Sequence, residues 1–96
     1  MAESIMSLRE VYAYRIYLSS VEKDIVNKTI NILKKLVGEN NIININVKES
    51  KVVDNFYLIE VYSTIKVDLS IINKEISHIG LNEFNFKVDM ALVKKP

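Results

Sequence analysis

The stretch that decides the fold is Asn55-Phe56-Tyr57-Leu58-Ile59-Glu60-Val61-Tyr62-Ser63-Thr64, in which aromatic and branched residues surround a single charge. Apolar side chains on both faces are typical of a central strand in a sheet. Side chains alternate across a strand, so two faces can be assigned. We expect helices to cover Tyr57, Ile59 and Val61. The other face carries Phe56, Leu58, Glu60 and Tyr62.

The chain before this stretch predicts a strand, a helix and a second strand. Glu10–Leu18 is rich in aromatic and β-branched residues and predicts the first strand. Ser19 followed by Glu22 has the form of a capping box, and apolar residues at helical spacing predict a helix over Ser20–Val37. The period then changes to two in Ile42–Lys48, a half-exposed second strand. Its residues expected to face the helices are Ile43, Ile45 and Val47.

The remaining elements follow from similar patterns. A turn near Glu49 to Lys51 leads into the third strand, Val53–Thr64. Asp68 is the expected N-cap of a second helix, Asp68–Ile79, which Gly80 ends. Glu83–Val93 alternates apolar and polar residues and predicts the last strand.

The predicted element order is therefore β-α-β-β-α-β. Short connections and right-handed crossovers favour an α+β, ferredoxin-like βαββαβ fold. This fold has a four-stranded antiparallel sheet in the order 4-1-3-2, with two helices on one face. The expected core consists of Ile30, Leu33, Ile59, Val61, Ile72, Ile76, Phe86 and Val88.

Length and composition indicate one small domain over residues 1–96, with 1–8 as a loosely ordered lead-in and 94–96 as a tail. The residues are 49% hydrophobic and 26% charged, which is a globular composition. A net charge of +1 provides no general attraction to nucleic acid or anionic membranes. The chain has no cysteine, no signal-peptide pattern and no apolar run long enough to span a bilayer, so we expect a cytoplasmic protein.

The sequence contains no strong catalytic, metal or phosphate motif. Its two glycines exclude a Gly-rich phosphate loop. His78 is the only histidine, and we expect it to interact with a helix C-terminus. The acidic residues are scattered without the spacing of metal ligands. The sequence therefore predicts a protein that is not an enzyme and that needs no cofactor and no metal.

The helix-free face of the sheet, called the open face below, is the predicted site of function. Its first strand presents one of two sets: Val11, Ala13, Arg15 and Tyr17, or Tyr12, Tyr14, Ile16 and Leu18. The first set is preferred because it brings Arg15 near Glu60 and leaves the larger apolar set for the helices. An exposed apolar patch within a polar border is typical of an interaction surface. The candidate interface or ligand residues are Tyr17, Phe56, Leu58, Tyr62, Arg15, Glu60 and Lys87.

Three occupants of this face are considered. The first is a second copy of the chain, giving a homodimer in sheet-to-sheet or edge-to-edge contact. The second is single-stranded RNA stacked on the aromatic rings. The third is a different protein or a small ligand. We expect the protein to form a homodimer or to bind a partner, and we expect no contact with a membrane. Binding of nucleic acid is the alternative function.

The RNA alternative depends on a partial resemblance to RNA-recognition motifs. Ile16-Tyr17-Leu18 resembles their first-strand motif, and residues 55–61 resemble part of their third-strand motif. The chain departs from the pattern at Asp54 and Asn55, where a basic residue and glycine are expected, and at Leu58, where an aromatic is expected. We therefore do not assign the chain to that family.

Overall fold

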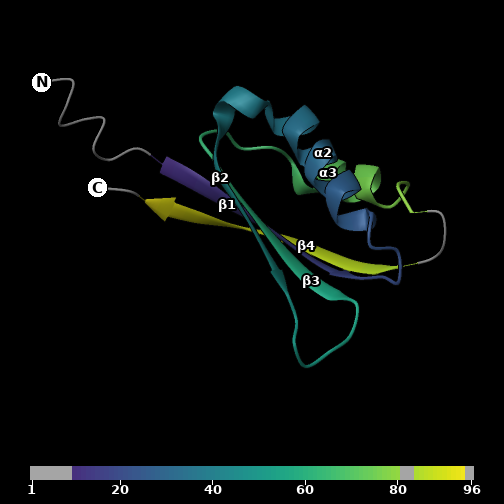
Figure 1. Ribbon diagram of the computed structural model, residues 1–96. Coiled ribbons are helices and arrows are strands. Elements are labelled where there is room, and N and C mark those ends of the chain that lie inside the picture. The colour runs from purple at the N-terminus through teal and green to yellow at the C-terminus, as the bar shows by residue number, and fades with distance from the viewer. Residues whose placement is uncertain (1–9, 81–83, 95–96) are drawn as a thin grey trace, which may run out of the picture.

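The computed structural model describes residues 10–80 and 84–94. This part of the chain is an α+β unit with one antiparallel sheet of four strands and two α-helices. The elements are β1 (Glu10–Ser19), α2 (Ile25–Val37), the 3₁₀ turn η1 (Glu39–Asn41), β2 (Ile42–Glu49), β3 (Phe56–Ser63), α3 (Leu69–Ile76) and β4 (Asn85–Lys94). Figure 1 shows α2 and α3 together over one face of the sheet. The predicted lead-in, residue 83 and residues 95–96 lie outside the described residues.

The strands are hydrogen-bonded in the order β2-β3-β1-β4. Counted from the opposite edge, this order is 4-1-3-2. All three neighbouring pairs are antiparallel. The two central strands are therefore β1 and β3, the most apolar segments of the chain, while β2 and β4 form the edges.

The core lies between the sheet and the two helices. Of the predicted core, Leu33, Ile59, Val61, Ile72 and Ile76 are fully buried. The other predicted core residues are partly buried and pack against them: Ile30, Phe86 and Val88. β1 contributes Tyr14, Ile16 and Leu18 to the same core. The preferred orientation of β1 is therefore confirmed, and Arg15 and Tyr17 lie on the open face.

The first helix begins later than the sequence predicted. α2 starts at Ile25, and no side chain caps its N-terminus at Asp24. The backbone N–H of Ser20 donates to the carbonyl of Asn55 at 3.0 Å, and the Ser20 hydroxyl accepts from the N–H of Glu22 at 3.0 Å. Because these bonds hold residues 20–22 in a turn beside the β2–β3 connection, the predicted start at Ser20 and the capping box from Ser19 are wrong.

Two predictions about β2 also need correction. The register shifts between Ile42, opposite Ser63, and Asn44, opposite Tyr62, so Ile43 is the extra residue of a β-bulge. Ile42 packs against the core, whereas Ile43 is 49% exposed. Val47 lies opposite Ile59, yet it is 43% exposed because the β2–β3 hairpin extends beyond the helices (Figure 1).

The β2–β3 hairpin turns at residues 50–55. The hydroxyl of Ser50 accepts from the backbone N–H of Val52 and of Val53, at 3.2 and 2.9 Å. Asn55 has a φ of 60°, a left-handed conformation that asparagine tolerates better than most residues. β3 therefore begins at Phe56, three residues after the predicted start at Val53.

The second helix is shorter than predicted at its C-terminus. Asp68 is the N-cap as expected, and its carboxylate accepts from the N–H of Ser70 at 2.9 Å. α3 ends at Ile76, and the chain continues in a turn through His78 and Ile79. Gly80 therefore follows a turn rather than the helix itself.

Candidate interaction surface on the open face

The open face is organised in rows that run across the strands. Strand pairing fixes which residues are neighbours, because residues opposite each other in antiparallel strands lie on the same face. The central row consists of Asn46, Glu60, Arg15 and Asp89, from β2 to β4. The next row towards the hairpin consists of Lys48, Leu58, Tyr17 and Lys87. The row on the other side consists of Asn44, Tyr62, Ala13 and Ala91.

The central row, with Lys48 from the next row, forms a charged network that we call the charged row. Arg15 Nε lies 3.7 Å from Glu60 Oε2, and Arg15 Nη1 lies 3.9 Å from Asp89 Oδ1. Glu60 Oε1 lies 3.7 Å from Lys48 Nζ and accepts from Asn46 Nδ2 at 3.3 Å. The Glu60 side chain is only 12% exposed, so this carboxylate is largely screened from water at the centre of the face.

On the hairpin side of this row lies an apolar cluster formed by Tyr17, Phe56 and Leu58. Tyr17 is opposite Leu58, and Phe56 is one row further along β3, opposite Ser19. All three side chains are partly exposed. A shallow hollow of about 210 Å³ adjoins this cluster and is lined by Tyr17, Ser19, Phe56, Asn85, Phe86 and Lys87.

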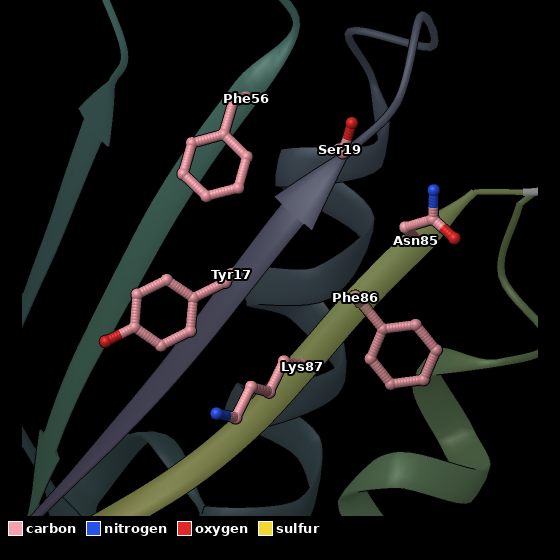
Figure 2. A pocket seen from close by; sticks show the side chains of 6 residues that line it. All are labelled: Tyr17, Ser19, Phe56, Asn85, Phe86 and Lys87. Atoms are coloured by element: carbon pink, nitrogen blue, oxygen red, sulfur yellow. The ribbon is translucent and has the colours of Figure 1, made fainter. Parts of the chain in front are cut away.

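Figure 2 shows how the side chains around this hollow lie. The rings of Tyr17 and Phe56 lie over the central strands, and the side chain of Lys87 extends from β4 towards Tyr17. The ring of Phe86 points away from them, beyond the outer side of β4. The hollow is therefore bordered by Tyr17 and Phe56 on the central strands, and by Lys87, Phe86 and Asn85 on β4, with Ser19 at the end of β1.

Beyond the charged row, on the other side, the face is apolar and already closely packed. Ala13 lies between Tyr62 and Ala91 and is fully buried, although no helix covers this face. Val11, opposite Val93, is 1% exposed. Tyr62 is partly exposed at the border of this group.

All seven predicted site residues lie on the open face, but they do not form one group. Glu60 and Arg15 separate Tyr62 from the apolar cluster, so the expected single apolar patch is divided in two. Lys87 lies directly opposite Tyr17 and joins the hollow. Whether these residues form a functional interface stays a prediction.

Sequence reasoning did not single out Ser19 and Asp89. The sequence predicts a helix-capping role for Ser19, but Ser19 is the last residue of β1 and lines the hollow. Asp89 pairs with Arg15 across the neighbouring strands β4 and β1. The alternation of Lys87, Val88 and Asp89 on an edge strand beside Arg15 is the signal that would have identified this pair.

Residues 10–80 and 84–94 contain no group of three or more acidic or histidine side chains that could hold a metal ion. His78 is exposed in the turn that follows α3. No helix in the described part of the chain has the length and apolar character needed to cross a membrane.

No protein-family model matches the chain, and neither a curated protein nor a solved structure does.

Proposed function

We propose that the protein is a non-enzymatic α+β module of the ferredoxin-like βαββαβ type, which acts by homodimerisation through its open face. The observation that carries this proposal is the order of charges in the charged row. The central row carries Asn46 on β2, Glu60 on β3, Arg15 on β1 and Asp89 on β4, and Lys48 lies one row away on β2. The Glu60–Arg15 pair at the centre of this row is complementary to its own reverse.

Two-fold symmetry gives the partner's row that reverse order. In an isologous interface, residue i contacts residue j of the partner and j contacts i. With an axis parallel to the strands, between β1 and β3, Arg15 faces the partner's Glu60 twice. Asp89 faces the β2 edge of the partner, which carries Asn46 and Lys48. Opposite potentials at these positions favour this alignment over competing alignments.

The apolar cluster supplies area on one side of the row. In this arrangement Tyr17 faces the partner's Leu58, and burial of aromatic side chains contributes strongly to interface stability. Two twisted sheets pack with their strands about 30° apart, so the corners of the sheets diverge. Lys48 and Lys87, which would otherwise approach each other, lie at these corners.

The test is Phe56→Asp with Val52→Asp as the matched control. Phe56 is partly buried in the apolar cluster, whereas Val52 is 92% exposed in the hairpin turn. We expect the wild-type protein to sediment as a dimer and Phe56→Asp to shift it towards monomer, because an unpaired charge would be buried in the interface. Val52→Asp should remain dimeric. A dimer unaffected by Phe56→Asp would contradict the proposal.

A second candidate function, binding of single-stranded RNA, is favoured by the hollow beside Tyr17 and Phe56. Aromatic rings on a sheet stack bases, and Lys87 provides a cation for a phosphate. On this alternative the wild-type protein is a monomer whose RNA affinity falls steeply as salt rises. Phe56→Ala should then cost about 1–3 kcal/mol of binding free energy. A monomer that binds no RNA would reject both functions and leave a different protein or a small ligand.

A further inference from the structure

The outer edge of β4 is a long and regular strand edge. β4 has ten residues without proline. Its pairing with β1 runs without a shift, from Glu10 opposite Lys94 to Ser19 opposite Asn85. In residues 10–80 and 84–94 no strand pairs with its other side. The opposite edge, β2, is interrupted by the bulge at Ile43. Proteins usually block edges with bulges, prolines or charges, because a long regular edge readily pairs with another strand.

The sequence of β4 is complementary to itself when read antiparallel. With Val88 opposite Val88 of a second copy, Lys87 lies opposite Asp89, and this pair occurs twice on the open-face side. On the helix side, Phe86 lies opposite Met90, also twice. Opposite charges and apolar pairs at directly opposed positions both stabilise antiparallel strands. We propose that β4 pairs with β4 of a second copy about a two-fold axis at Val88, joining two sheets into one of eight strands.

A polar atom at this edge lacks a strong partner. Asp89 Oδ1 is buried and has no hydrogen bond in the described residues, and its nearest cation, Arg15 Nη1, is 3.9 Å away. Lys87 is exposed. In the proposed register the partner's Lys87 lies opposite Asp89 and brings an ammonium group to that carboxylate. Because unpaired buried acceptors are costly, this contact favours the paired state.

The helix side of the edge also has room for a partner's side chain. A hollow of about 570 Å³ lies there, lined by Lys66, Val67, Asp68, Leu69 and Met90. The ring of Phe86 extends beyond the outer side of β4, as Figure 2 shows. In the proposed register the partner's Phe86 lies opposite Met90, at the side of this hollow. Aromatic rings make favourable contacts with methionine sulfur, so this pairing stabilises the edge contact.

This contact is separate from the face-to-face dimer. Its two-fold axis is perpendicular to the sheet, so both open faces point to the same side and stay uncovered. The edge contact joins two copies along one strand only and buries less area than the face-to-face contact, so the face-to-face contact sets the mass in dilute solution. The edge inference goes beyond the proposed function, and either contact can fail without the other.

Disulfide trapping at the axis tests the edge contact. The chain has no cysteine, so each single variant carries one thiol. Opposed Cα atoms in antiparallel strands are about 4.5–5.5 Å apart, within the range that a disulfide bridges. Under mild oxidation, Val88→Cys should form a disulfide-linked dimer in at least about tenfold higher yield than the control Val47→Cys. Val47 is on the other edge strand and is 43% exposed, so it reports random collisions.

Charge variants then test the register. Lys87→Glu combined with Val88→Cys places a carboxylate opposite the partner's Asp89 and should reduce cross-linking. A mixture of this variant with Asp89→Lys, Val88→Cys should restore it, because opposite charges face each other again. Phe56→Asp combined with Val88→Cys should still cross-link, even if Phe56→Asp alone disrupts a face-to-face dimer. Yields for Val88→Cys no higher than for Val47→Cys, or a mixture that restores nothing, would overturn the inference.

Discussion

The hydroxyl of Tyr14 donates to the carbonyl oxygen of Ile65 at 2.9 Å and accepts from the N–H of Val67 at 2.7 Å. Tyr14 is fully buried on β1, and the two backbone groups belong to the connection between β3 and α3. This side chain therefore fixes the crossover to the sheet. The backbone polar groups of a loop need hydrogen-bond partners, and here one hydroxyl group is the partner of two of them.

Removing this hydroxyl should destabilise the protein measurably. Tyr14→Phe keeps the ring but leaves the groups of Ile65 and Val67 without that partner, which costs about 1–3 kcal/mol. Chemical denaturation monitored by circular dichroism measures this change. Tyr12→Phe is the control, since the Tyr12 hydroxyl donates to the exposed Glu10 carboxylate at 3.1 Å. Equal losses for the two variants would contradict the role given to Tyr14.

The same residue predicts a loss of stability at alkaline pH. Burial raises the pKa of Tyr14 above its ordinary value of 10.0, although the hydrogen bond from Val67 acts in the opposite direction. The unfolded chain then loses this proton at lower pH than the folded chain. The stabilising contribution is therefore complete below pH 10.0 and is lost as pH rises through the higher folded pKa. Tyr14→Phe should show a smaller decrease in stability above that pH.

The N-cap of α3 predicts a loss of stability at acidic pH. Hydrogen bonds from the Ser70 N–H and hydroxyl, each 2.9 Å long, lower the pKa of Asp68 below its ordinary 3.8. The contribution of this carboxylate is present above that value and is lost as pH falls through the folded pKa. Asp68→Ala should lower the denaturation midpoint at neutral pH. Asp68→Asn should retain most of the stability of the wild-type protein, because asparagine is also a good N-cap residue. A midpoint unchanged by Asp68→Ala would contradict the capping role.

Much of the fold was predictable because its signals are local. Period-two patterns located β2 and β4, and aromatic and β-branched residues located β1 and β3. The alternation of β3 assigned both of its faces correctly. The bulge at Ile43 was not predictable, since it depends on which residue of β3 each residue of β2 meets. The start of α2 was missed because the amide of Ser20 bonds to Asn55, which is distant in sequence.

The open face was predictable residue by residue but not as a surface. Alternation placed Glu60 and Tyr62 on it, yet it gave no distances between strands. The burial of Ala13 on a face without helices comes from its neighbours in the sheet, which no single segment reveals. Asp89 Oδ1 makes no hydrogen bond within the described residues and lies 3.9 Å from Arg15 Nη1, a geometry that likewise needs coordinates.

The assignment of the β3 faces predicts a large difference between two alanine variants. Ile59 on β3 is fully buried between the sheet and the helices, whereas Lys34 is on α2 and partly exposed. Ile59→Ala should cost about 2–5 kcal/mol, because it removes apolar contact and leaves a cavity. Lys34→Ala should change the unfolding free energy much less. Equal shifts in a denaturation midpoint would mean that the faces are misassigned.

The final prediction concerns the two-fold axis of the proposed face-to-face dimer. If Arg15 faces the partner's Glu60, Arg15→Glu places two carboxylates against each other at two symmetry-related positions. Glu60→Arg does the same with two guanidinium groups. Like charges in contact cost several kcal/mol in an interface, so each variant alone should be largely monomeric in sedimentation experiments. An equimolar mixture should form a 1:1 heterodimer, because each new charge then faces its opposite.

The mixture also controls for folding, since each variant disturbs the contact between Arg15 and Glu60 within its own sheet. A chain that had merely unfolded would not be rescued by a second defective chain. An axis perpendicular to the strands would instead place Arg15 over the partner's Arg15, and Arg15→Glu would only replace one like pair by another. Dimerisation of Arg15→Glu at wild-type strength would therefore exclude the parallel axis, whereas rescue only in the mixture would support it.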